Sequence, residues 1–190
     1  MDSIDGTGYN IFAMNPKPRL SLLFRRDEID TAIRRLAAEI TRDYQDKHPI
    51  LIGILKGSFM FMADLIRLLD FPIEIEFIRL SSYGKGTETS GKVGMVEGLR
   101  CPIQGRDVVI VEDIVDSGLT INFLIDYLRK IKPASLKLCV LLDKPSRRQV
   151  PVSIDYLGLT VPDKFIVGCG LDWDEKFRNL PDICILEEQG

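Results

Sequence analysis

Residues 108–120 read VVIVEDIVDSGLT and place three carboxylates, those of Glu112, Asp113 and Asp116, within five positions. Small and hydroxyl-bearing residues follow directly after Asp116, where a helix is expected to begin. Backbone N–H groups at a helix start bind phosphate, and hydroxyl side chains add further donors. The second half of this stretch is therefore expected to bind a phosphate group.

Glu112 and Asp113 have the opposite chemistry, because a carboxylate repels phosphate. Neighbouring carboxylates accept hydrogen bonds from a sugar diol or attract a hydrated Mg²⁺. Together, the two halves of the stretch suit a phosphorylated sugar. The alternative is that the acids only cap a helix and solvate a loop, which explains any one of them better than all three after a buried strand. The sequence GxxxxGK[ST] occurs nowhere in the chain, which disfavours a P-loop nucleotidase.

The elements that must position these residues follow from the hydrophobic periodicity. Apolar residues at helical spacing predict a helix over residues 27–45, with Asp27 as its N-cap. Continuous or alternating apolar runs predict strands, and two further apolar segments predict helices. The other expected helices are residues 59–70 and 119–131, and the expected strands are residues 50–55, 73–80, 107–113, 135–143, 152–159, 165–168 and 183–186.

This alternation of strands and helices predicts an α/β fold, with a central, mostly parallel sheet flanked by helices. We expect a single domain over residues 21–190, with its core at about 27–150, after a loose N-terminal arm of residues 1–20. Ligands bind beyond the carboxyl ends of the strands in such a sheet. Four polar segments follow expected strands and should converge there, namely LKGS, the long polar loop of residues 81–93, EDIVDSGLT and DKPSRR.

Composition argues against several other functions. The chain has 190 residues and a net charge of −3, which argues against a nucleic-acid partner. Its only histidine, His48, makes a Ser-His-Asp system or a structural zinc site improbable. No apolar stretch is long enough to cross a membrane. The four cysteines form no CxxC pair, so we expect free thiols and a cytoplasmic protein.

The stretch VEDIVDSGLT resembles the phosphoribosyl-pyrophosphate (PRPP) motif of type I phosphoribosyltransferases, in the version found in hypoxanthine-guanine phosphoribosyltransferases. The similarity covers roughly residues 20–187 and has five blocks in the same order. The other four blocks are ILKGS (54–58), EFIRLSSYG (76–84), LLDKPSRR (141–148) and PDKFIVGCGLDWDEKFRNLPDIC (162–184). The resemblance implies the type I phosphoribosyltransferase fold. It also implies a small base-binding hood from the terminal segments, mainly residues 151–190.

The resemblance implies roles around the ribose and its phosphate. Glu112 and Asp113 would hold the ribose hydroxyls, directly or through Mg²⁺, and Asp116 would act as the general base near N7 of the purine. The remaining residues of the PRPP motif would cradle the 5′-phosphate, namely Ser117, Gly118, Leu119 and Thr120. Leucine at position 119, where some members have lysine, is more similar to bacterial members.

Further roles implied by the resemblance concern pyrophosphate and the base. Pyrophosphate would be bound by residues 55–57 (Leu55, Lys56 and Gly57), with a bond before the lysine that is often cis in this family, and by Arg178. Lys144 would donate a hydrogen bond to the 6-oxo group of the purine. The rest of the purine site would be Lys164, Phe165, Ile166 and Asp172.

Two remaining implied roles concern the metal and a lid. Asp172 would also help to hold a Mg²⁺ on the pyrophosphate. Ser82 and Tyr83 would belong to a flexible lid that closes over the reaction and excludes water.

The implied activity is purine salvage with Mg²⁺ as cofactor. PRPP would react with a 6-oxopurine base, hypoxanthine and also guanine, to give IMP or GMP and pyrophosphate. The chain would form a homodimer or a homotetramer. One alternative is a phosphoribosyltransferase for another base, such as xanthine or a pyrimidine. Another is a regulator that keeps the fold but binds nucleic acid, which Asp116, Lys144 and the acidic pI disfavour.

Overall fold

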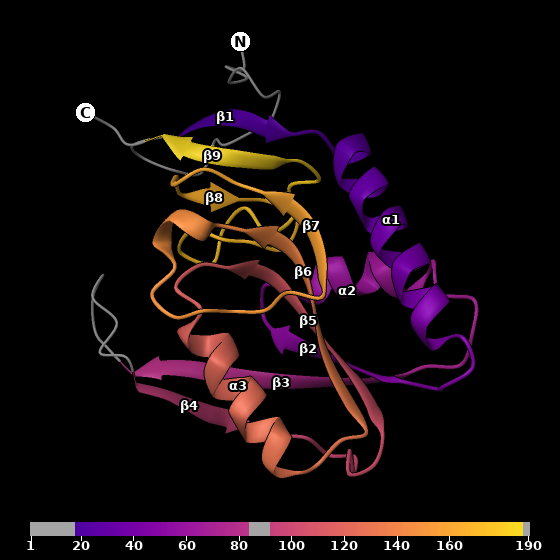
Figure 1. Cartoon of the computed structure of the whole chain (residues 1–190). Helices are drawn as coiled ribbons and strands as arrows, with labels where there is room; N and C mark the ends of the chain where they lie inside the picture. Colours follow the sequence, from indigo (N-terminus) through magenta and orange to yellow (C-terminus); the bar gives the residue numbers. More distant parts are fainter. Residues whose placement is uncertain (1–17, 84–91, 188–190) are drawn as a thin grey trace.

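The computed structural model describes residues 18–83 and 92–187, and it contains two sheets with flanking helices (Figure 1). The larger sheet has the strand order β4-β3-β2-β5-β6-β7, and the smaller has the order β1-β9-β8. The elements are β1 (Arg19–Phe24), α1 (Arg26–Tyr44), β2 (Ile50–Leu55), α2 (Phe59–Ile66), β3 (Glu74–Tyr83), β4 (Lys92–Glu97), β5 (Asp107–Val115), α3 (Leu119–Lys130), β6 (Ser135–Asp143), the short 3₁₀ helix η1 (Pro145–Arg147), β7 (Tyr156–Thr160), β8 (Ile166–Val167) and β9 (Ile183–Glu187).

The larger sheet is parallel except at one edge. β2 pairs in parallel with β3 and β5, and β6 pairs in parallel with β5 and β7. β4 runs antiparallel to β3 at the edge. The predicted α/β fold with a mostly parallel central sheet is therefore confirmed.

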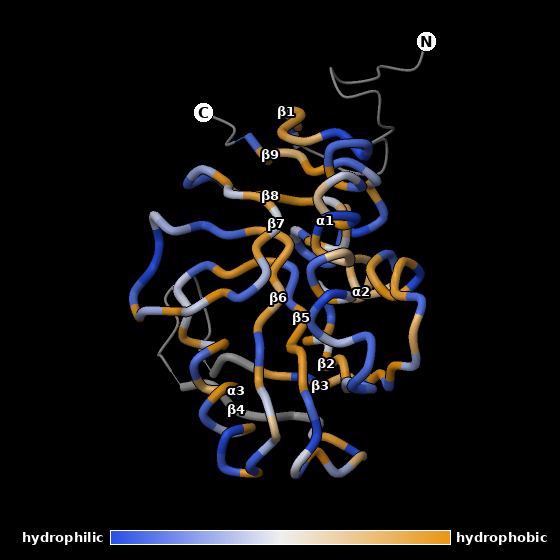
Figure 2. The backbone as a smooth tube through the Cα atoms, turned by 45° about the vertical axis from the view of Figure 1, so that its right-hand side comes forward, coloured by the Kyte–Doolittle hydropathy of each residue, from blue (hydrophilic) through white to orange (hydrophobic). Residues whose placement is uncertain are grey.

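Alternate residues of the central strands face two separate cores. In β5, Val109 and Val111 belong to the core that also contains residues of α1 and α2, whereas Val108 and Ile110 belong to the core with α3. Figure 2 shows hydrophobic stretches along the central strands and hydrophilic segments near their ends. Because both faces of these strands are covered, polar side chains that serve a ligand must gather at the strand ends.

The smaller sheet joins the two ends of the described chain. β9 pairs antiparallel with both β1 and β8, and the sheet lies beside β7 (Figure 1). The smaller sheet has a small hydrophobic core, in which Leu20 is buried. Arg19 and Leu20 were expected in the loose arm but are instead the first residues of β1. Residues 1–17 of that arm lie outside the described residues.

The start of α1 differs from the expectation. The helix begins at Arg26 with Arg25 at the N-cap position, so the prediction of Asp27 as N-cap is wrong. Asp182 Oδ1 accepts a hydrogen bond from the Arg26 backbone N–H at 2.7 Å, and Glu28 Oε2 accepts one from the Arg25 N–H at 2.9 Å. The carboxylate of Asp182, from the segment before β9, therefore accepts a hydrogen bond from a backbone N–H group at the start of α1.

The helix expected over residues 59–70 is shorter than predicted. α2 ends at Ile66, and the next backbone bonds join Leu68 N–H to Leu65 and Leu69 N–H to Ile66, each three residues back. This tightening ends the helix before the Phe71–Pro72 step, where proline disfavours helical geometry in the residue before it.

The loop expected over residues 81–93 begins and ends as strand. β3 continues to Tyr83, β4 starts at Lys92, and Ser82 pairs with Val93 in the antiparallel register. Pairing between these two segments supplies the strand structure that their polar composition did not indicate. Residues 84–91 lie outside the described part of the chain. The remaining predicted elements are all present, with shifted ends in most cases.

Candidate functional site

The expected phosphate loop joins β5 to α3. Gly118 has φ +86°, a left-handed conformation that favours glycine. A Cβ atom at this position would lie 2.7 Å from Val152 Cγ2 and 2.9 Å from the Val150 carbonyl oxygen. The first bond within α3 runs from the Asn122 N–H to the Gly118 carbonyl at 3.0 Å. The preceding amides therefore belong to the open helix start that binds anions.

A segment that the sequence did not single out supports this loop from behind. The Ser117 carbonyl accepts hydrogen bonds from the backbone N–H groups of Gln149 (2.9 Å) and Val150 (3.3 Å). Asn122 Nδ2 donates to the Pro151 carbonyl at 3.2 Å. Residues 149–151 thus hold the phosphate loop in place, although only their position after DKPSRR could have indicated this role.

Glu112 and Asp113 form a buried acidic pair at the end of β5. Glu112 is only 8% exposed, and its Oε2 has no hydrogen-bond partner among the described residues. Burial, with the nearby charge of Asp113 as a second cause, raises the pKa of Glu112 well above its ordinary value. Burial also raises the pKa of Asp113 to about 6. Two carboxylates in this state favour a cation or a hydroxyl donor beside them.

The LKGS loop packs directly against this acidic pair. The Leu55–Lys56 peptide bond is cis, as the resemblance implied. A Cβ atom on Gly57 would lie 1.9 Å from Asp113 Oδ2, so only glycine allows the backbone to come this close. The Ser58 hydroxyl is buried and donates to the Ile54 carbonyl at 2.7 Å, which closes the turn.

Lys144 is buried, with 5% of its surface exposed. Its Nζ donates a hydrogen bond to the Lys164 carbonyl at 2.8 Å and lies 3.9 Å from Asp116 Oδ2. Its backbone N–H donates to the Val115 carbonyl at 3.0 Å. Burial is the largest influence on this amine and lowers the pKa of Lys144. The structure thus brings the end of β6, the hood and the PRPP motif together at one amine.

Lys144, Asp113 and Asp116 line a cleft of about 260 Å³. Phe165 lies in it with 51% of its surface exposed, which leaves an aromatic face free to stack on a flat ligand. The cleft contains all five residues of the predicted purine site and two acids of the PRPP motif. Its lining is Asp113, Ile114, Asp116, Lys144, Arg147, Lys164, Phe165, Ile166, Leu171 and Asp172.

Three of these lining residues were not predicted, namely Ile114, Arg147 and Leu171. Each lies inside a segment that the sequence did single out: EDIVDSGLT, DKPSRR and the block at residues 162–184. An apolar or basic residue within such a segment gives no separate signal of its own. Only the shape of the cleft identifies these side chains.

A cationic cluster adjoins the cleft on the hood side. Arg178 Nη2 pairs with Asp172 Oδ1 at 2.7 Å, and Arg178 Nη1 donates to the Gly170 carbonyl at 2.8 Å. Lys56 Nζ lies 2.8 Å from Glu175 Oε2, and Arg178 Nη2 lies 3.5 Å from the same oxygen. The two cations predicted to bind pyrophosphate therefore meet at one carboxylate. Glu175 was not predicted as a site residue.

The predicted lid is described only in part. Ser82 and Tyr83 are residues of β3, but their side chains and residues 84–91 lie outside the described part of the chain. Their role as a lid stays a prediction.

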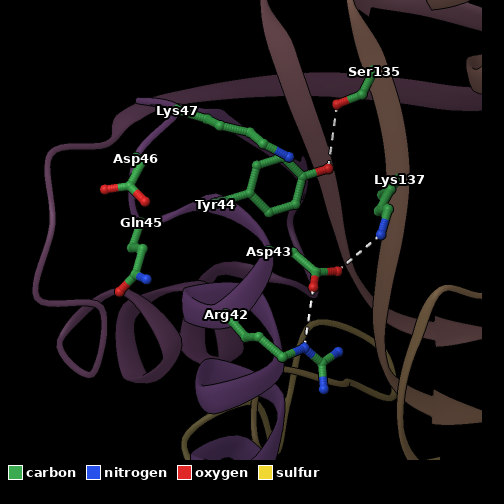
Figure 3. Close-up of a pocket in the computed structure, with 8 residues that line it drawn as sticks. All are labelled: Arg42, Asp43, Tyr44, Gln45, Asp46, Lys47, Ser135 and Lys137. Carbon is green, nitrogen blue, oxygen red and sulfur yellow. Dashed lines mark hydrogen bonds and ion pairs between the residues drawn. The ribbon is translucent and has the colours of Figure 1, made fainter.

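A larger hollow of about 500 Å³ lies where α1 ends and β6 begins (Figure 3). Its groups are paired with one another: Asp43 Oδ2 lies 2.9 Å from Lys137 Nζ, and the Tyr44 hydroxyl lies 3.3 Å from Ser135 Oγ. These contacts tie α1 to β6. The smaller cleft at the carboxyl ends of the strands is therefore the candidate active site.

The chain is similar to known proteins in sequence. Residues 25–174 match the model of a family described as the phosphoribosyl transferase domain. The hypoxanthine-guanine phosphoribosyltransferase of Bacillus subtilis is 46% identical over 166 residues, which cover 87% of this chain and 92% of that protein. The protein of the same name from Aquifex aeolicus is 46% identical over 171 residues, covering 90% and 96%.

Solved structures agree with these similarities. A hypoxanthine phosphoribosyltransferase from Staphylococcus aureus superposes with a TM-score of 0.84 at 42% identity, covering 88% of this chain and 91% of that one. A hypoxanthine-guanine phosphoribosyltransferase from Bacillus anthracis, with HEPES in its active site, gives a TM-score of 0.84 at 46% identity, covering 88% and 98%.

Proposed function

The chain belongs to the phosphoribosyl transferase domain family, and from this premise we propose that it is a purine salvage enzyme. It transfers the 5-phosphoribosyl group from PRPP to hypoxanthine, and to guanine as well, giving IMP or GMP and pyrophosphate. The observation that carries the proposal is one cleft that contains the buried amine of Lys144, the exposed ring of Phe165 and the carboxylate of Asp116.

The cleft suits a 6-oxopurine. Phe165 would stack on the base, and Lys144 would donate a hydrogen bond to the 6-oxo group. An ammonium group only donates, so it fits the 6-amino group of adenine badly. The Lys144 amine donates a hydrogen bond of 2.8 Å to the Lys164 carbonyl, and this contact holds the amine in one orientation. Ile166 and Asp172 also line the cleft.

The acidic pair and the turn after it suit the ribose 5-phosphate. Glu112 and Asp113 would accept hydrogen bonds from the two ribose hydroxyls, and the phosphate would be bound by residues 117–120. Gly118 supports this role because its left-handed backbone keeps the turn open at the start of α3. The two halves would then bind the two ends of the same ribose 5-phosphate.

Mg²⁺ is the expected cofactor. A cation would compensate the buried carboxylate of Glu112, one oxygen of which has no hydrogen-bond partner among the described residues. Within residues 18–83 and 92–187, no group of three or more His, Cys, Asp or Glu side chains could hold a metal ion by itself. Glu112 and Asp113 would therefore hold it together with substrate oxygens, as is usual for Mg²⁺, and Asp172 would help at the pyrophosphate. When bound, Mg²⁺ neutralises charge on the leaving pyrophosphate.

In the reaction, the bond from C1 of the ribose to pyrophosphate breaks while a ring nitrogen of the base forms the new bond to C1. Asp116 would accept the proton that the base loses at N7. Lys56 and Arg178 would bind the departing pyrophosphate, with the backbone of residues 55–57. A lid that includes Ser82 and Tyr83 would exclude water from the developing positive charge on the sugar.

A spectrophotometric assay with PRPP, Mg²⁺ and each base in turn tests this function. We expect turnover with hypoxanthine and guanine and little with adenine. Turnover with xanthine or a pyrimidine alone would identify a transferase for another base. Failure to convert any 6-oxopurine would contradict the proposal, and failure to convert any base at all would favour a nucleic-acid-binding regulator. Steady-state constants for hypoxanthine, guanine and xanthine would then rank the bases.

We further propose a cytoplasmic protein, which is supported by the state of its cysteines. None of the four cysteines, all of which are described residues, forms a disulfide, and three of them are buried, as in proteins of reducing compartments. No helix formed by the described residues is long and apolar enough to cross a bilayer.

A further inference from the structure

Glu175 occupies a backbone position that favours glycine. Trp173 and Lys176 close a tight turn with two backbone hydrogen bonds of 3.1 and 3.0 Å. The two central residues, Asp174 and Glu175, have φ values of 53° and 61°. Turns of this kind favour Asn-Gly or Asp-Gly, because glycine adopts positive φ without strain. A glutamate at the second position is therefore disfavoured unless its side chain has a use.

The side chain of Glu175 joins two cations from distant parts of the chain. Its Oε2 lies 2.8 Å from Lys56 Nζ and 3.5 Å from Arg178 Nη2, and under the proposed function both cations bind pyrophosphate. Arg178 also retains an unused donor, because its buried Nε has no hydrogen-bond partner among the described residues. Lys56 and Arg178 therefore share one oxygen of Glu175. Arg178 also pairs with Asp172 Oδ1 at 2.7 Å, and its Nε is still available to another acceptor.

We propose that Glu175 is an internal substitute for pyrophosphate, an inference that rests on the proposed function. In the unliganded protein its carboxylate pairs with Lys56 and Arg178, and an incoming diphosphate displaces it. Glu175 is 65% exposed on its side chain, so it can swing into solvent without a cavity being left behind. The same competition assists the release of pyrophosphate after transfer.

The energetics permit this exchange. The Lys56–Glu175 pair joins two exposed side chains, and such pairs are weak, because solvent screens them and the side chains lose freedom on pairing. Arg178 is more buried but lies farther from the Glu175 oxygen, at 3.5 Å. A diphosphate carries several charges and can accept hydrogen bonds from both cations at once, which a single carboxylate oxygen does less well. Displacement is therefore favourable, but Glu175 still reduces the net affinity for pyrophosphate.

Asp174 provides a matched control within the same turn. It also has positive φ, and its carboxylate pairs with Lys176 Nζ at 2.8 Å. Asp174→Asn therefore removes one negative charge from the turn without touching Lys56 or Arg178. Glu175→Gln removes the competing charge at nearly constant size.

The test is a calorimetric titration of magnesium pyrophosphate into the wild type, Glu175→Gln and Asp174→Asn. Loss of two weak ion pairs should make Glu175→Gln bind about three- to tenfold more tightly, while Asp174→Asn stays within about twofold of the wild type. Added salt should shrink the advantage of Glu175→Gln, because salt screens exposed charges. KM for PRPP should fall in parallel.

The opposite results would overturn the proposal. Equal or weaker binding by Glu175→Gln, with an unchanged thermal midpoint, would mean that Glu175 positions Lys56 rather than competing with the ligand. Equal tightening by Asp174→Asn would indicate a general charge effect. If the wild type neither bound magnesium pyrophosphate nor turned over a 6-oxopurine, the proposed function would fail, and this inference with it.

Discussion

The surroundings of Lys144 set its chemistry. A lone lysine after a strand is ordinarily a surface residue, but here the amine is buried and donates to the Lys164 carbonyl. Nearby Asp116 favours its charged form, whereas burial disfavours it and lowers the pKa of Lys144. An amine held in this way can discriminate between an acceptor and a donor at the same place on a base.

Lys144→Gln should erode the selectivity against adenine. A glutamine amide can turn its carbonyl or its NH₂ group toward the base, so it pairs with a 6-amino group as well as with a 6-oxo group. We expect the ratio of kcat/KM for hypoxanthine to that for adenine to fall by about 10- to 100-fold, the value of one mismatched buried polar group. Unchanged selectivity would mean that another group recognises the 6-position.

Asp116→Asn should slow the transfer step more than it weakens substrate binding. The carboxylate lies in the cleft, and its Oδ1 has no hydrogen-bond partner among the described residues, so it is available to accept a proton. Loss of a general base lowers kcat by roughly 10²–10⁴. The measurement is steady-state kinetics together with PRPP binding by calorimetry. Near-normal kcat in this variant would exclude Asp116 as the base.

Among the secondary-structure elements, α1 depends on a distant segment for its start. Asp182, just before β9, accepts the Arg26 backbone N–H at 2.7 Å and so acts as a cap supplied from far along the chain. Asp27, which local sequence favours as N-cap, lies instead in the first turn of the helix. The contact also fixes the hood to the helix that covers one face of the larger sheet.

Asp182→Ala should therefore destabilise the protein more than Asp27→Ala does. Removing a helix cap costs about 0.5–2 kcal/mol, whereas a first-turn carboxylate contributes about 0.3–1 kcal/mol through the helix dipole. Urea unfolding of both variants measures the difference. An Asp27→Ala variant that lost more stability than Asp182→Ala would show that the local cap dominates.

A second network ties α1 to two strands at the opposite end of the sheet. Asp43 Oδ2 accepts hydrogen bonds from the Tyr156 hydroxyl at 2.7 Å and from Lys137 Nζ at 2.9 Å; the ion pair with Lys137 is drawn in Figure 3. The Tyr156 hydrogen bond, followed by that of Lys137, holds the pKa of Asp43 well below its ordinary value. The charged carboxylate thus joins α1, β6 and β7.

This network predicts a pH-dependent contribution to stability. A lowered pKa means that Asp43 stabilises the fold above its unfolded pKa of about 4 and loses that effect as the pH falls further. Asp43→Asn should lower the free energy of unfolding at pH 7 by about 1–3 kcal/mol, and the difference from the wild type should shrink below about pH 4. Urea unfolding at several pH values measures it. As a control, Asp46→Asn changes an exposed neighbour, and its free energy of unfolding should stay within about 0.5 kcal/mol of the wild type. A loss of stability in Asp43→Asn that does not depend on pH would contradict the role of the charged carboxylate.

At the scale of the whole molecule, the site exists only where the two sheets meet. The larger sheet supplies the expected phosphate loop, the acidic pair and Lys144, while the segments around β8 and β9 supply Phe165, Asp172 and Arg178. Gly170 connects them, because a Cβ there would lie 2.1 Å from the Gly57 carbonyl oxygen. The hood and the LKGS loop therefore pack backbone against backbone.

The whole molecule is also expected to self-associate into a homodimer or a homotetramer. Several large apolar side chains are more than one third exposed, among them Phe59 of α2 and Phe77 of β3, and burying such surface favours association. Light scattering should give two or four times the chain mass of 21.5 kDa. A mass of one chain at micromolar concentration would contradict this expectation.

The sequence by itself determined those features that short segments encode. The buried runs at residues 50–55 and 135–143 become strands with the predicted ends, because continuous apolar residues need a sheet covered on both faces. EDIVDSGLT indicated a site for a phosphorylated sugar, because its acids and the small residues after them are neighbours in the sequence. All five residues of the predicted purine site line one cleft.

Only the tertiary structure decided the features that depend on residues far apart in the chain. β1 and β4 are strands because β9 and β3 pair with them, and α1 starts at Arg26 because Asp182 reaches it. The burial of Lys144 and the meeting of Lys56, Arg178 and Glu175 arise in the same way. Periodicity and spacing report the preferences of a segment for helix or strand. They do not show which distant backbone group or charged side chain will pair with the polar groups of that segment. In this protein, such distant partners complete the candidate site.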